Sequence, residues 1–317
     1  GVNCDPCGLG QDCAVDADCR VGRCIGATTT EGTCQMGSME DTGTSSMEDT
    51  GTDDADTGGG ASPDCPTAKA VGGVKGVDRP ASDDIATLPL KTVALSGAGS
   101  TDPDGTIDRY EWSFLDKPET SSATLQPDAT AEEPQLFLDA AGTYRLELTA
   151  YDAAGNANCG ESAEVRIRAI PADDVYIEVT WATPGDSNPD DATGSDVDLH
   201  YHSAGSPWND PSSDTFAGSP TGGGGELVRA DADGRGPEVL EDSNIPNGDR
   251  EVGIHYNEAG GLGPVDVTTR IYLRGMLTEE IADQELSGEN AFRHNATITW
   301  PQATVTPTGN AERQGFP

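Results

Sequence analysis

Short segments in which apolar and polar residues alternate recur along most of this chain, and they constrain its fold more than any other feature. The clearest spans residues 142–151, where Tyr144, Leu146 and Leu148 fall on one side and Arg145 falls on the other. A period of two is the pattern of a β-strand with one buried face. Glycine and proline, 40 and 21 of the 317 residues, supply turns between such strands. The sequence therefore predicts an all-β protein.

The segments fall into two groups, which predict two antiparallel β-sandwiches, at residues 63–171 and 172–306, followed by a tail at 307–317. Short strands separated by turns are typical of an Ig-like or jelly-roll-like sandwich. In the first group the expected strands are Thr92–Ser96, Ile107–Phe114, Ala123–Leu125, Gln135–Leu138, Gly142–Tyr151 and Ala163–Arg168. In the second they are Asp174–Trp181, Asp196–Tyr201, Arg250–Tyr256, Val267–Arg274 and Ala296–Trp300.

The 8 cysteines indicate an oxidising compartment. An even number crowded into residues 1–36 predicts a small disulfide-rich module, whose pairing the spacing leaves open. Zinc is the alternative because Cys4-x-x-Cys7 has ligand spacing, but no second such pair and no histidine lies near. The cysteines of this module are Cys4, Cys7, Cys13, Cys19, Cys24 and Cys34. We expect the other two, Cys65 and Cys159, to pair with each other and close the first sandwich.

Residues 37–62 form an acidic linker of Ser, Thr and Gly with an internal repeat, Ser38–Thr44 and Ser46–Thr52. This linker has too few apolar residues to offset the entropy of ordering, so we expect a spacer. Its many hydroxyl groups leave open a second interpretation, an O-glycosylated stalk.

The balance of 18 Lys+Arg against 56 Asp+Glu gives a net charge of −38, which repels nucleic acids and anionic membrane surfaces. No apolar run approaches the roughly 18 residues of a membrane span, and we expect no span. The first residues lack a basic and apolar signal peptide, as in a processed, mature chain. Adaptation to high salt is another explanation of the acidity, and it would weaken any case for calcium.

Two stretches of the first group resemble the PKD domain, the immunoglobulin-like repeat of bacterial and animal surface proteins. They are Leu95-Ser-Gly-Ala-Gly-Ser-Thr-Asp-Pro-Asp-Gly-Thr-Ile-Asp-Arg-Tyr-Glu-Trp112 and Ala141-Gly-Thr-Tyr-Arg-Leu-Glu-Leu-Thr-Ala-Tyr-Asp-Ala-Ala-Gly155. The family's usual Asp-Phe-Gly-Asp-Gly after the tryptophan is replaced here by residues 113–125, which are closer to the REJ-like branch.

Asp102 and Asp104 lie in a turn where hard oxygens could converge on Ca²⁺. The PKD resemblance adds Asp152 to this candidate calcium site. The alternative is a turn in which the Asp side chains only cap backbone amides.

The strings Ser195-Asp-Val-Asp-Leu-His200 and Asp231-Ala-Asp-Gly-Arg-Gly-Pro-Glu238 resemble a bacterial surface domain marked by Asp-Val-Asp-Leu-His. That family has no settled activity, so the resemblance implies only architecture and an extracellular setting. Residues 12–24 resemble the small disulfide knots of secreted bacterial and animal proteins.

Two ion sites are candidates in the second group. Its acidic residues would repel one another unless a cation such as Ca²⁺ joined them, and the alternative is a solvated acidic rim. Histidines two apart on a strand share a face, so a third from a neighbouring strand would complete a zinc or copper site, although strand histidines are more often packed. The acidic candidates are Asp196, Asp198, Asp231, Asp233 and Glu238, and the histidines are His200, His202 and His255.

No catalytic motif is present, and a chain with 34% hydrophobic and 5% aromatic residues is too polar for one large enzyme core. We therefore expect a non-enzymatic extracellular protein, either an adhesion module or the repeating subunit of a filament. Its expected partners are further copies of itself or a cell-surface glycan or protein, bound through the surface loop Ser203–Gly225. The alternative is an accessory carbohydrate- or protein-binding component of a secreted enzyme system, using exposed Trp181, Trp208 or Trp300.

Overall fold

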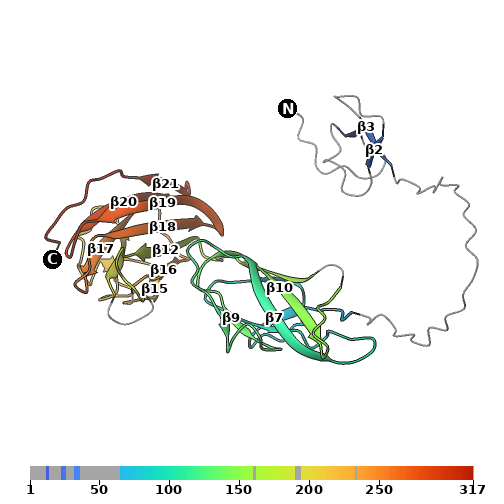
Figure 1. Cartoon of the computed structure of the whole chain (residues 1–317). Coiled ribbons are helices and arrows are strands. Elements are labelled where there is room, and N and C mark those ends of the chain that lie inside the picture. Colours follow the sequence, from blue (N-terminus) through green and yellow to red (C-terminus); the bar gives the residue numbers. More distant parts are fainter. Residues whose placement is uncertain are drawn as a thin grey trace, which may run out of the picture. The chain divides into compact units, whose positions relative to one another are not determined.

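The computed structural model describes residues 65–159, 162–189, 194–232 and 234–316 in full, and the backbone of three short strands before them (Figure 1). The chain divides into two compact units, Gly1–Gly59 and Gly60–Pro317. In the first unit, β1 (Asp12–Cys13), β2 (Arg23–Ile25) and β3 (Gly32–Gln35) form an antiparallel sheet in the order β1-β3-β2. The side chains of the six amino-terminal cysteines and the linker at 37–62 lie outside the described residues.

Within the second unit, residues 65–171 form a sandwich of two four-stranded sheets, ordered β5-β11-β10-β7 and β4-β6-β9-β8. All pairings are antiparallel except the parallel pair of β5 and β11. Tyr144, Leu146 and Leu148 of β10 face a core that also contains Trp112, as their alternation predicted. The strands are β4 (Val71–Val74), β5 (Asp84–Thr87), β6 (Thr92–Ser96), β7 (Ile107–Asp116), β8 (Leu125–Gln126), β9 (Gln135–Phe137), β10 (Gly142–Asp152) and β11 (Ala163–Ala169).

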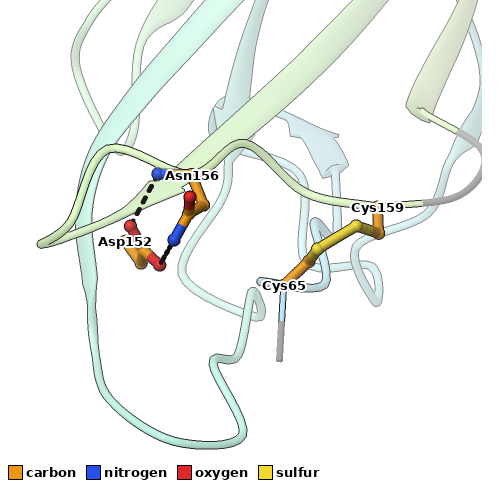
Figure 2. The surroundings of a disulfide bond; sticks show 4 residues. All are labelled: Cys65, Asp152, Asn156 and Cys159. Atoms are coloured by element: carbon orange, nitrogen blue, oxygen red, sulfur yellow. Dashed lines mark hydrogen bonds between the residues drawn. A yellow bond between two sulfur atoms is a disulfide. The ribbon is translucent and has the colours of Figure 1, made fainter. Parts of the chain in front are cut away.

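A disulfide joins Cys65, at the start of this sandwich, to Cys159 in the segment between β10 and β11 (Figure 2). The two cysteines are 94 residues apart in the sequence, so the bond closes nearly the whole sandwich into one loop. Such a cross-link stabilises the fold by removing conformations from the unfolded chain.

A second sandwich follows, with two five-stranded sheets ordered β15-β16-β12-β18-β19 and β14-β13-β17-β20-β21. Both sheets are antiparallel throughout, and the all-β prediction is confirmed. Among the described residues, no helix has the length and apolar character needed to cross a bilayer. The strands are β12 (Val175–Ala182), β13 (Asp196–Ser203), β14 (Asp214–Thr215), β15 (Glu226–Arg229), β16 (Glu238–Asp242), β17 (Gly248–Glu258), β18 (Val265–Leu273), β19 (Met276–Leu286), β20 (Phe292–Trp300) and β21 (Thr304–Pro307).

Strand β13 is buried on both faces. Val197, Leu199 and Tyr201 point into the core between the sheets. Asp198 and His200 occupy alternate positions and therefore lie on the opposite face of the sheet, yet they are buried as well. This outer face is covered by aromatic side chains from the loop after β13, from β20 and from the carboxyl-terminal segment.

The expectation that residues 203–225 form a surface loop is wrong for the middle of that segment. It contains β14, where Asp214 and Thr215 are fully buried. Trp208 is only partly exposed, and its ring centroid lies 3.8 Å from that of His202. The segment folds back over the sheet because β14 pairs with residues 201 and 202 of β13.

The two sandwiches meet at a small buried contact within the second unit. The carboxylate of Glu178, on β12, accepts hydrogen bonds from the amide of Ala141 at 2.5 Å and from the hydroxyl of Tyr176 at 3.1 Å. Tyr272 donates to the carbonyl of Ala141 at 3.3 Å. Val239 packs in the same cluster. Glu178 is 1% exposed; its Oε1 atom is satisfied in part by the backbone of the first sandwich, whereas its Oε2 atom is buried without a hydrogen-bond partner.

Candidate metal centre

The acidic turn of the first sandwich is arranged mainly by its own hydrogen bonds. Asp152 accepts two hydrogen bonds from Asn156, one from its backbone amide and one from its side-chain amide, each 2.7 Å long (Figure 2). These hydrogen bonds lower the pKa of Asp152. Partial burial and interaction with Asp104 raise the pKa of Asp102. The charges of Asp104 and Asp152 both act on Asp102, but Asp152 has the contacts of a turn cap, the alternative to a calcium ligand.

The acidic candidates of the second sandwich are only partly brought together. Glu238 is 1% exposed and accepts a hydrogen bond from the amide of Leu199 at 2.5 Å. Burial and the charge of Asp198 raise its pKa well above the usual value. Asp196 lies close enough to Asp198 to be affected by its charge, and burial raises the pKa of Asp196 to about 6. Asp231 pairs instead with Arg229 at 2.7 Å. The remaining candidate, Asp233, lies outside the described residues.

A tighter group forms between one of these acids and two of the histidines. Asp198, His200 and His255, which we call the trio, each offer a ligand atom, and all of these atoms lie within 4.8 Å of one another. Asp198 and His255 are direct cross-strand partners on β13 and β17. His200 lies two residues beyond Asp198 and therefore on the same face. Among the described residues, no other group of three His, Cys, Asp or Glu side chains meets this criterion.

The third histidine of the sequence prediction, His202, takes no part in the trio. Its Nδ1 atom lies 2.8 Å from the carbonyl oxygen of Ser203, and its ring packs on Trp208. The fourth histidine of the chain, His294, lies on β20 with Nε2 3.1 Å from the carbonyl of Ala296. The sheet β14-β13-β17-β20-β21 thus carries all 4 histidines of the sequence.

His200 is oriented by a buried carboxylate that the sequence did not reveal. Its Nδ1 atom lies 2.7 Å from Oδ2 of Asp214, which also accepts a hydrogen bond from the amide of Asn209 at 2.7 Å. A carboxylate accepts hydrogen bonds, so Nδ1 of His200 carries a proton, and in the neutral ring Nε2 has the lone pair. The Nε2 atoms of His200 and His255 are both buried without a hydrogen-bond partner in the protein. His200, with a carboxylate behind its ring, thus has the arrangement of a metal-binding histidine, while Nε2 of His202, outside the trio, is buried without a partner as well.

Aromatic rings shield the trio from water. Phe216 stacks on His200 with ring centroids 5.1 Å apart, while Phe316 and Phe292 lie edge-on at 5.3 and 5.9 Å. Gly253, the cross-strand partner of His200, makes room for them. A Cβ atom at Gly253 would lie 2.6 Å from Phe292 and 2.9 Å from Trp208. The polar donors are therefore held in apolar surroundings, where an unpaired polar group is costly.

Sequence analysis found all three members of the trio but assigned them to two different sites. Their spacing on β13 places Asp198 and His200 on one face, which is the signal that could have joined them. The register of β13 on β17, and the return of Asp214 through β14, depend on contacts between distant segments.

Comparison with known proteins identifies part of the chain. The family model described as K319L-like, PKD domain, matches residues 81–167, which confirms the PKD resemblance for that region. The solution structure of the PKD domain from KIAA 1837 protein is 26% identical, covering 27% of this chain and 80% of that one, with a TM-score of 0.23. No curated protein matches this chain. The resemblances stated for residues 12–24 and for the second sandwich stay predictions.

Two longer alignments cover about two thirds of this chain. The D00-D0 domain of Intimin is 13% identical and covers 69% of this chain and 98% of its own, with a TM-score of 0.22. A SusE-like surface located polysaccharide binding protein from Bacteroides thetaiotaomicron is 12% identical, covering 67% and 87%, with a TM-score of 0.23. No function is inferred from TM-scores this low.

Proposed function

We propose that this chain is a non-enzymatic extracellular protein, an adhesion module or the repeating subunit of an extracellular filament. The PKD match at residues 81–167 and the disulfide between Cys65 and Cys159 support an extracellular setting. The observation that carries the structural role is the buried contact between the two sandwiches.

That contact couples the two sandwiches mechanically. Adjacent domains usually move relative to one another unless their interface is large and hydrophobic; this contact is small, so its hydrogen bonds have to contribute to the coupling. Here Glu178 and Tyr272 of the second sandwich bond to the backbone of Ala141 in the first. Arg270 adds a hydrogen bond to the hydroxyl of Thr120 at 2.9 Å. Ala141 packs with Tyr176, Val239 and Tyr272, and separating the sandwiches would expose these buried side chains to water, which opposes separation. A resistant joint is what a load-bearing surface protein needs.

The tryptophans favour this role over the alternative of an accessory carbohydrate-binding component. Sugar-binding surfaces typically present aromatic rings that are free to stack on the ligand. Trp181 and Trp300 are 4% and 8% exposed, and Trp208 packs on His202 and Phe292. All three side chains are thus occupied in packing within the second sandwich.

The test is the size of the purified, non-reduced chain, measured by multi-angle light scattering and negative-stain imaging, with Ca²⁺ and then with a chelator. Fibres or large oligomers would support the filament subunit, and their loss in chelator would place ions at the joints between subunits. A monodisperse monomer in both conditions would contradict self-assembly. Glycan and protein arrays would then decide between the adhesion module and the accessory role.

A further inference from the structure

We propose that Asp198, His200 and His255 bind one divalent first-row transition-metal ion, of which Zn²⁺ is the probe. The ion fastens β13 to β17 on the outer face of the second sandwich, near β14, which carries Asp214. This proposal is independent of the role in adhesion or filaments.

The geometry of the trio suits such an ion. Zn²⁺ binds nitrogen and carboxylate oxygen at about 2.1 Å, so the donors of a tetrahedral site lie about 3.4 Å apart. The ligand atoms of the trio already lie within 4.8 Å of one another, so small side-chain rotations bring them to that spacing. Asp198 and His255 sit on paired strands, which fixes their backbones before any ion arrives.

The hydrogen bonding of the trio leaves two buried nitrogen atoms available to a further partner. The Nε2 atoms of His200 and His255 are buried without a hydrogen-bond acceptor or donor in the protein. Asp214 holds the proton of His200 on Nδ1, so the free Nε2 presents a lone pair. A metal ion accepts that lone pair, and a carboxylate behind a histidine both orients the ring and makes it a stronger ligand.

Charge favours a cation at the same place. Asp198 is buried, and Asp196 and the buried Glu238 are the other carboxylates of the acidic candidates that the structure describes beside Asp231. Among the described residues, none of these three carboxylates forms an ion pair with Lys or Arg. Arg313 is the nearby cation, but its guanidinium lies over the rings of Phe292 and Phe316. A doubly charged ion at the trio would give the buried carboxylate of Asp198 a charge partner.

The donor types select the class of metal. Ca²⁺ and Mg²⁺ prefer oxygen ligands, and two of the three donors in the trio are imidazole nitrogens. Imidazole suits Zn²⁺, Cu²⁺, Ni²⁺ and Co²⁺, and a group of two histidines and one carboxylate is an established ligand set for such ions. The trio is therefore a site distinct in chemistry from the calcium site expected among the acidic residues.

The experiment uses the full, non-reduced chain, stripped with chelator and dialysed. Co²⁺ is titrated while visible absorption is recorded, and Zn²⁺ is then added as competitor. We expect the chain to bind one equivalent of Co²⁺ and to show the visible absorption of a low-symmetry site with nitrogen and oxygen ligands. One equivalent of Zn²⁺ should displace the Co²⁺. Absence of saturable binding in the wild-type chain would overturn the proposal.

Two variants and a matched control assign the ion to the trio. His255→Ala and the nearly isosteric Asp198→Asn should each weaken Co²⁺ binding at least tenfold. His294→Ala removes a histidine of the same sheet that lies outside the trio, and it should bind as the wild type does. Far-UV circular dichroism of each variant without metal checks that it folds. If His255→Ala does not fold, the nearly isosteric Asp198→Asn still tests the assignment. Equal binding by Asp198→Asn and His294→Ala would refute the assignment.

Discussion

The acidic turn of the first sandwich and the trio of the second place similar ligand atoms in different situations. Asp152 receives two hydrogen bonds from Asn156, four residues further along the chain. His200 donates one hydrogen bond, from Nδ1 to Asp214, and its other ring nitrogen is buried without a partner. A polar group that is satisfied locally needs no ligand, whereas a buried group that is left unsatisfied is costly unless a ligand completes it. The contrast holds between Asp152 and His200; among the acidic candidates of the first sandwich, the Oδ1 atom of Asp102 is buried without a partner.

The two regions also differ in how they are held together. The first sandwich is closed covalently between Cys65 and Cys159. The outer face of the second is closed by non-covalent packing of Trp208, Phe216 and Phe316 on the histidines. The four predictions below test this comparison.

Replacement of both Cys65 and Cys159 by Ser should produce the largest loss of stability. A disulfide closing a loop of about 100 residues contributes roughly 4–5 kcal/mol through the entropy of the unfolded chain. We expect the free energy of unfolding of the first sandwich to fall by about 4 kcal/mol in chemical denaturation. The Co²⁺ absorption of the second sandwich should be unchanged, because the trio lies outside the closed loop. Loss of both properties together would contradict the separate closure of the two regions.

Glu178→Gln should change how stability depends on pH. Burial raises the pKa of Glu178 from 4.5 to about 7. Between these values the folded chain keeps a proton that the unfolded chain has lost, so stability falls as pH rises from about 4.5 to about 7. The loss attributable to Glu178 is at most about 3 kcal/mol, and the Gln variant should lack it.

Unfolding titrations at pH 4.5 and 7.5 measure this difference. Glu164→Gln is the control, since Glu164 lies on the surface and pairs with Arg145 at 2.8 Å. Asp196 and Glu238 have raised pKa values too. Both variants should therefore retain the part of the pH dependence of the free energy of unfolding that these two residues cause. If the free energy of unfolding of Glu178→Gln depended on pH as that of the wild type does, burial at the contact between the sandwiches would not raise the pKa of Glu178.

Asp214→Asn tests the carboxylate behind His200. Loss of such a partner typically weakens metal binding by about 10–100-fold, because the ring loses its preferred tautomer and orientation. Competition of Zn²⁺ against a chromophoric chelator measures the change. Asp210→Asn is a matched control in the same loop, where Asp210 bonds to Ser212 rather than to a histidine. Equal affinities of the two variants would remove Asp214 from the site.

Ca²⁺ should have the smallest effect. Asp152 already accepts two hydrogen bonds within its turn, so a calcium ion would have to displace them. We expect millimolar Ca²⁺ to raise the melting temperature of the full chain less than stoichiometric Zn²⁺ does. A larger rise in melting temperature with Ca²⁺ than with Zn²⁺ would contradict this expectation. If Asp102→Asn abolished that rise, the calcium site that the PKD resemblance implies would be supported.

The sequence predicted strands well where one face is apolar and poorly where both faces are polar. β10 and β12 were expected almost at their observed bounds because alternating apolar residues pack in the cores. β19 was missed, since its eleven residues lie at the edge of their sheet and are mostly exposed. β14 was missed because two residues carry no periodic pattern. Pairing with a neighbour, which no local pattern reports, creates both strands.

By itself the sequence determined the all-β class, the two sandwiches and the face of β13 that carries Asp198 and His200. These properties follow from local chemistry, because the period of two fixes which side chains share a face. Only the tertiary structure decided that Asp198 meets His255 and that Asp214 supports His200. It also decided that aromatic rings seal the group. Such contacts join segments many residues apart, and their register is set by the packing of the whole sheet rather than by any one strand.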